Sequence, residues 1–341
     1  GVNASELRKL LTFLAGRIRA CPTDTFNDQS MSSALNGMQR LSSDYAEVRL
    51  VLKELSDKFS FSSSSSSSSS GNSGNILISS KGVGSALMGL RSMSSRCPEV
   101  RIMLDILADK IELLPVSETL TPFTISSAVN GLRCMSDDEP EVKRMLQILS
   151  DILMRTNIQH GDLDPPTTAN ILSGLAGMTK HSKELRRMLA VVDTKILGNP
   201  HAKTSVPYRS VDIALSLYGL QGIDVTKCAE VRPILRKLAK RIEQMRPQEV
   251  LQSRHISLAL YGCKTLVRSS SKPAALLGQG RSKQPKQQRK QQQQKQKQKQ
   301  QEPELDQRVV PYDEEINLVL AALAHKIEQS NDKERRLPGG R

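Results

Sequence analysis

The sequence predicts an all-α fold, a right-handed α-solenoid of about six two-helix repeats with a period of about 42–43 residues. Two residues mark each repeat, and apolar residues around both keep the spacing of one helical face. The first marker is a glycine, found at Gly37, Gly89, Gly131, Gly174, Gly219 and Gly262. The second is a glutamate, which follows most of these glycines ten residues later; the series is Glu6, Glu47, Glu99, Glu141, Glu184, Glu230 and Glu315.

The glycine spacing identifies the class of repeat. After a first interval of 52 residues, which contains the serine run 62–70, the intervals are 42, 43, 45 and 43. Tetratricopeptide repeats have a period of roughly 34, whereas HEAT and armadillo repeats have roughly 40–47. The period therefore favours HEAT/armadillo-like units.

The first helix of each unit, helix A, is expected to run through the glycine. Around Gly131 the apolar residues Ile125, Val129, Leu132 and Met135 follow steps of four, three and three, which hold one helical face. The residue three before the glycine is small in five of the six units. A glycine inside a helix costs roughly 1 kcal/mol against alanine, so its repetition indicates close approach of a neighbouring helix.

The second helix, helix B, begins near the glutamate. In the second unit the apolar residues Val100, Met103, Leu104 and Leu107 form a stripe typical of a helix buried on one side. Ser, Thr, Asp or Pro residues mark its start, and Lys or Arg eleven residues after the glutamate suits the negative end of the helix dipole.

Two segments interrupt the repeats and are expected to be disordered, because polyserine and Lys/Gln tracts have no apolar face to bury. The chain also opens on a single helix that matches a helix B, whose helix A is expected upstream. The predicted organisation is a leading helix in 1–20, repeats in 28–267 with a Ser-rich insert at 61–75, a Lys/Gln-rich insert at 268–308, a closing helix in 309–330 and a disordered tail at 331–341.

The composition favours an anionic partner. The 341 residues carry a net charge of +14, and the insert 268–308 holds 11 Lys/Arg against 3 Asp/Glu. A basic balance suits nucleic acid, an acidic protein or an anionic surface. With no Trp and 3% aromatic residues, the chain resembles stacked hairpins more than a compact enzyme.

The sequence predicts no catalysis, no cofactor and no metal site. It contains no HExxH, GxSxG, Walker-type or GxGxxG motif. Its five cysteines form no CxxC pair, which fits a reducing intracellular compartment. No apolar run approaches the roughly 18 residues of a membrane helix, so no membrane insertion is expected.

The blocks Ala-Leu-Tyr-Gly-Cys at 259–263 and Gly-Leu-Arg-Ser-Met-Ser-Ser-Arg-Cys-Pro-Glu-Val-Arg at 89–101 resemble repeats of the octotricopeptide and heptatricopeptide type. Such repeats occur in organelle RNA-binding proteins. The resemblance implies an α-solenoid that binds RNA, with the mitochondrion or chloroplast as its compartment.

The first candidate site set lies one residue before and two residues after each glycine. These positions of helix A are three apart, so they are neighbours on one face, and they avoid the buried stripe. Amide, guanidinium and tyrosyl groups there could hydrogen-bond to or stack on one RNA base per repeat, or could be ordinary solvated side chains. The residues are Asn36, Gln39, Met88, Arg91, Asn130, Arg133, Ser173, Tyr218, Gln221, Tyr261 and Lys264.

The second candidate set is a cation two residues after the glutamate. It could form a ladder of phosphate contacts or, as the sequence favours, ion pairs with the carboxylates of the same and adjacent units. The residues are Arg8, Arg49, Arg101, Lys143, Arg186 and Arg232.

The sequence thus leads to a non-catalytic binding protein that holds single-stranded RNA along a concave face, as organelle RNA processing or stability factors do. The alternative is a HEAT/armadillo-like protein–protein scaffold, in which the same groove takes an extended or acidic protein segment.

Overall fold

The computed structural model confirms the all-α class, because all regular secondary structure in the residues it describes is helical. Those residues are 4–22, 27–64, 78–115, 118, 120–156, 164–196, 206–246, 248–270 and 314–336.

The helices fall into two rows, each made of alternate elements along the chain. Row A consists of α2 (Asp28–Gly37), α4 (Ser80–Gly89), α6 (Pro122–Gly131), α8 (Pro165–Gly174), α10 (Ser210–Gly219) and α12 (Ser253–Ser270). Row B consists of α1 (Ala4–Ala20), α3 (Ala46–Ser64), α5 (Pro98–Glu112), α7 (Pro140–Arg155), α9 (Lys183–Val191) with the π-helical turn η2 (Val192–Ile196), α11 (Val231–Glu243) and α14 (Glu314–Arg336).

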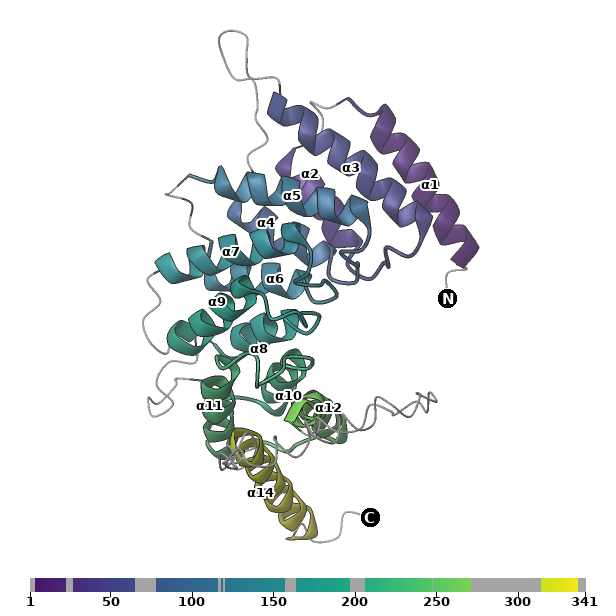
Figure 1. Ribbon diagram of the computed structural model, residues 1–341. Coiled ribbons are helices and arrows are strands. Elements are labelled where there is room, and N and C mark those ends of the chain that lie inside the picture. The colour runs from purple at the N-terminus through teal and green to yellow at the C-terminus, as the bar shows by residue number, and fades with distance from the viewer. Residues whose placement is uncertain are drawn as a thin grey trace, which may run out of the picture.

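Each helix packs mainly on its neighbours in the same row, so the elements stack in sequence order instead of closing around one centre. Figure 1 shows this stack following a curved path from α1 to α14. In that view α8, α10 and α12 lie nearer the open side of the curve than α9 and α11.

The row A helices are short and begin at capped ends. α2, α4, α6, α8 and α10 each have ten residues. Four of them start after a side chain that accepts a hydrogen bond from the backbone N–H three residues later, which satisfies one orphan donor of the first turn. These N-cap residues are Asn27, Ser79, Thr121 and Asp164.

The predicted apolar stripes form the core. Ile125, Val129, Leu132 and Met135 of the third unit are fully buried, and so are Val100, Met103, Leu104 and Leu107 of α5. The Leu, Ile, Val and Met side chains of both rows join in one continuous buried cluster. Most stabilisation therefore comes from apolar contact between successive helices, at roughly 25 cal/mol per Å² buried.

The repeated glycines lie where one row A backbone touches the next. A Cβ atom at Gly131 would come within 3.0 Å of the carbonyl group of Leu87, two residues before the glycine of the preceding unit. The same overlap with the same relative carbonyl recurs at Gly89, Gly174, Gly219 and Gly262. At Gly37, in the first helix of the row, nothing lies within 4 Å. The predicted close approach between neighbouring helices is thus confirmed.

The prediction that helix A continues through the glycine is wrong for five of the six units. α2, α4, α6, α8 and α10 end at the glycine, and a turn follows. In the second unit this turn is closed by hydrogen bonds from Leu90 N–H to Leu87 O and from Met93 N–H to Leu90 O, both 2.9 Å. Only α12 runs on past its glycine, to Ser270.

Three predicted boundaries also differ from the structure. α3 extends to Ser64, inside the insert predicted at 61–75; α12 extends to Ser270, inside the insert at 268–308; and α14 extends to Arg336, inside the tail at 331–341. Each helix continues for a few polar residues beyond its apolar stripe, because every added turn gains backbone hydrogen bonds once the helix is nucleated. The remainder of these three segments lies outside the described residues.

The outer face of α1 is the exception to the burial pattern. Leu10 and Leu14 are 52% and 41% exposed, whereas Met103 and Leu107, at the same repeat positions of α5, are fully buried. No described helix covers this side of α1.

We expect Gly131→Ala to lower the free energy of unfolding by about 1–3 kcal/mol or more, because the added methyl group overlaps a backbone that cannot move aside without shifting the row. Gly37→Ala is the matched control. It has the same repeat position but open space around it, so its stability should be unchanged or slightly raised. Denaturant unfolding followed by circular dichroism measures both; equal effects would show that the glycine contact is not a packing constraint.

Candidate nucleic-acid interface

The turns that follow the row A helices carry many of the predicted site residues, and hydrogen bonds join successive turns. Ser43 Oγ accepts from Ser94 N–H at 2.9 Å, and Ser95 Oγ accepts from Ser136 N–H at 3.0 Å. In both of these units the donor is the backbone amide five residues after the glycine. The equivalent amide of each of the next two units also donates to a side chain of the preceding turn. There the acceptors are Asp137, for Thr179 N–H at 2.9 Å, and His181 Nε2, for Asp224 N–H at 2.8 Å.

Asp137 makes the strongest of these connections. Its buried carboxylate accepts backbone hydrogen bonds from Thr179 and Lys180 on Oδ1 and from Ser182 on Oδ2, at 2.9, 2.8 and 2.9 Å. A buried anion held by three N–H donors is a strong, charge-assisted arrangement. Asp137 was not among the predicted site residues, although a polar residue six positions after the glycine recurs at Ser43, Ser95 and Asp137 and could have indicated it.

His181 replaces this acceptor in the fourth turn. Its backbone has φ 58°, the left-handed region that non-glycine residues seldom adopt. Burial lowers the pKa of its imidazole below the ordinary value, with the nearby Asp224 and Asp137 carboxylates opposing the shift. The neutral ring is the form that can accept the Asp224 amide.

Four predicted site residues come together in a row that we call the Arg–Tyr strip: Arg91 and Arg133 from these turns, Tyr218 from α10 and Tyr261 from α12. The Arg133 guanidinium lies over the Tyr218 ring, 4.7 Å from its centroid. Tyr218 stacks on Tyr261 with ring centroids 6.1 Å apart and planes 25° apart. Arg133 thereby spans the fourth unit, whose side chains at these positions are the small Ser173 and Ala176.

The two arginines of the strip carry positive charge without a carboxylate partner among the residues that the structure describes. Burial lowers the pKa of Arg91, and repulsion from Arg133 lowers it further. Across the described residues, neither guanidinium takes part in an ion pair. Two adjacent uncompensated cations attract an anion, and arginine suits phosphate because its planar fork can donate two parallel hydrogen bonds.

The remaining residues of the first set are distributed unevenly. Asn36 and Lys264 are exposed, and Gln39, Met88 and Gln221 are half-buried. Asn130 and Ser173, however, are only 3% and 1% exposed, so the expectation that these positions avoid the buried side is wrong in the third and fourth units. Asn130 Nδ2 donates to Asn170 Oδ1 at 3.4 Å, and Ser173 Oγ donates to Asn170 O at 3.1 Å. The Asn130 Nδ2 group and the Ser173 hydroxyl are thus bonded inside the stack, while Asn130 Oδ1 has no hydrogen-bond partner among the described residues.

In the part of the chain that the structure describes, most members of the second predicted set make contacts other than the favoured ladder of ion pairs. Arg101 pairs with a carboxylate of the next unit, that of Glu139 at 2.9 Å. Arg49 donates to the carbonyl oxygens of Ser43 and Asp44, Lys143 donates to that of Asp138, and Arg8 lies over the Tyr45 ring. Arg186 is exposed, and Arg232 is half-buried.

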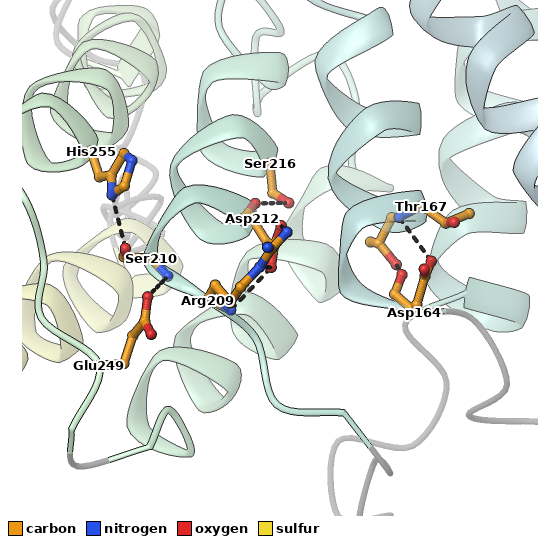
Figure 2. A network of polar contacts seen from close by, with 9 residues as sticks. Asp164, Thr167, Arg209, Ser210, Asp212, Ser216, Glu249 and His255 are labelled. Carbon is orange, nitrogen blue, oxygen red and sulfur yellow. Dashed lines mark hydrogen bonds and ion pairs between the residues drawn. The ribbon is translucent and has the colours of Figure 1, made fainter.

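A further polar cluster, at the start of α10, has the residue types of a hydrolytic site but not its geometry (Figure 2). Ser210 Oγ lies 2.8 Å from His255 Nδ1, and Glu249 accepts from Ser210 N–H at 2.8 Å. His255 Nε2 accepts from Arg254 Nε at 3.1 Å, so the proton is on Nδ1 and points at Ser210. A ring that donates to the serine cannot remove its proton. The cluster joins α10 to α12, and Ser210 and His255 are both buried.

Two of the cysteines are poor nucleophiles. Burial raises the pKa of the Cys228 thiol to about 12 and that of Cys263 to about 11, so neither ionises near neutral pH.

Over the described ranges, no three His, Cys, Asp or Glu side chains lie close enough to share a metal ion. Nor, in that part of the chain, is there a helix long and apolar enough to cross a membrane.

We expect Asp137→Ala to lower the free energy of unfolding by about 3 kcal/mol, because it leaves three N–H groups of the next turn without their acceptor. The neighbouring Asp138→Ala is the control. Its carboxylate is exposed and lies 3.7 Å from Lys180 Nζ, and such surface pairs contribute roughly 0–1 kcal/mol. Chemical denaturation of the two variants tests this; a loss below 1 kcal/mol for Asp137→Ala would contradict the assigned role.

Comparison with known proteins adds no identification. No family model matches the chain, and neither a characterised protein nor a solved structure matches it.

Proposed function

We propose that the chain is a non-catalytic helical-repeat binding protein, a right-handed α-solenoid of about six two-helix units, that binds single-stranded RNA along the turns of row A. The two rows of helices and the recurring glycine contact support the repeat architecture. The octotricopeptide-type resemblance supports RNA as the ligand, and with it a role in RNA processing or stability within an organelle.

The observation that carries the proposal is the pair of uncompensated arginines in the Arg–Tyr strip. Several arginines of row B, by contrast, are neutralised by carboxylates. Arg144, for example, pairs with Asp105, Asp109 and Glu112, each at 2.6 Å. Within the described ranges Arg91 and Arg133 have no such partner, and the strip continues into two stacked aromatic rings. Cations beside exposed aromatic rings are the combination by which proteins bind single-stranded nucleic acid.

A protein–protein scaffold is the second candidate, and the exposed apolar face of α1 favours it. Leu10, Leu14 and Phe13 are 52%, 41% and 64% exposed on one helix. Contiguous apolar groups of this kind mark contact surfaces for other proteins. This face lies on row B, away from the turns that carry the strip. The two candidate functions therefore use different residues, and substitutions can distinguish them.

The test measures binding of a random single-stranded RNA pool as a function of salt. Because the Lys/Gln-rich insert could bind RNA by charge alone, the eight Lys and Arg residues between 281 and 299 are first replaced by Gln. In this background we expect affinity to fall steeply with salt, and Arg91→Ala and Arg133→Ala each to weaken binding and reduce the salt slope by about 1.

Arg155→Ala is the matched control, since Arg155 is an exposed cation at the end of α7 in row B. It should leave affinity and salt slope unchanged. Absence of salt-dependent binding in the neutralised background, or equal effects of all three substitutions, would reject the proposal. Binding of a protein segment that is lost on Leu10→Asp would then favour the scaffold.

A further inference from the structure

We infer that Tyr261 is the stacking platform for a single unpaired nucleobase, and that the RNA backbone runs from it along the strip towards Arg133 and Arg91. This inference rests on the proposed function and narrows it. The proposed function allowed one RNA base to be recognised by every repeat. In the present inference a single base site instead lies at the C-terminal end of row A, and phosphate contacts continue from that site along the strip.

The contacts that position the Tyr261 ring are present without a ligand. Arg133 comes from the turn after α6, and Tyr261 comes from α12. α8 packs on both α6 and α10, and α12 packs on α10, so Arg133 reaches Tyr218 past α8 while Tyr261 reaches it from α12. Tyr218 thus contacts both Arg133 and Tyr261, and the Tyr261 ring is stacked on Tyr218 before a ligand is present. A ring fixed in advance loses little conformational entropy when a base stacks on it.

Tyr261 is the ring of this stack that is open to a ligand. Its side chain is 53% exposed, whereas Tyr218 is half-buried between Arg133 and Tyr261. The exposed Lys264 lies three residues further along α12, where side chains share a face with Tyr261. A base on the Tyr261 ring would thus have an ammonium group beside it for its phosphate.

The other units offer no equivalent platform. The residue one before the glycine is Asn36, Met88, Asn130 or Ser173 in the first four units, none of them aromatic. Asn130 and Ser173 are buried and bonded within the stack. Between the second and fifth units the strip consists of Arg91 and Arg133, whose chemistry suits phosphate and carries no sequence information by itself.

The ligand class that follows is single-stranded RNA with one base unstacked from its neighbours. Stacking on tyrosine tolerates any base, because every base has a π-face. Purines present the larger face, so we expect them to be preferred at this one position. Double-stranded RNA keeps its bases stacked inside the helix and should bind only through phosphates.

The experiment places one 2-aminopurine at successive positions of a short single-stranded oligoribonucleotide and titrates it with the full chain. We expect its fluorescence to change strongly at one position. At that position an abasic nucleotide should weaken binding about tenfold. Tyr261→Leu should weaken binding of the intact oligonucleotide by a similar factor and remove the abasic effect, whereas Tyr261→Phe should preserve both.

Tyr45→Leu is the matched control, because Tyr45 is an exposed tyrosine at the opposite end of the molecule that also lies against an arginine, Arg8. It should leave the fluorescence change intact. Salt-dependent RNA binding with no effect of the abasic nucleotide or of Tyr261→Leu would overturn this inference and leave the proposed function standing. Fluorescence changes at several evenly spaced positions would also overturn it. Absence of RNA binding by every variant would overturn both.

Discussion

The contact of a glycine Cα with the carbonyl group of the preceding row A helix sets the spacing on which the rest of the structure depends. It recurs at Gly89, Gly131, Gly174, Gly219 and Gly262 with the same carbonyl two residues before the preceding glycine. No side chain lies between the backbones at these points. The turns that follow are consequently close enough for Ser43, Ser95 and Asp137 to reach the next unit's amides, and for Arg133 to reach Tyr218.

In row B, long charged side chains connect neighbouring helices. Arg144 joins α7 to three carboxylates of α5, and Lys58 Nζ donates to the carbonyl oxygens of Arg19 and Cys21 at the end of α1. Lys326 makes the same connection to Arg246 O after α11, at 2.8 Å. Backbone contact therefore brings the row A helices together, whereas long charged side chains bridge neighbouring row B helices beside their apolar core. Figure 1 shows that the stack follows a curved path.

The helices and their buried faces could be predicted from sequence because both are periodic and local. The end of helix A could not. Leu132 and Met135, one and four residues after Gly131, suit a continuing helix as well as the hydrogen-bonded turn that is present. The burial of Asn130 and Ser173 also escaped prediction. The side chain of Asn130 bonds to Asn170, 40 residues away, and the sequence carries no local signal for such a contact. The contact of Arg133 with Tyr218 joins units two apart, for which the sequence carries no local signal.

The central claim, that glycine contacts hold the turns in register, is tested most directly by hydrogen exchange at the backbone amides of Ser94, Ser136, Thr179 and Asp224. Each amide lies in a turn yet donates to the preceding turn, so we predict slow exchange in the native protein. In Gly131→Ala, exchange should quicken at Ser136 first and change little at Asp224. Rapid exchange of all four amides in the native protein, at rates typical of exposed turns, would contradict the account.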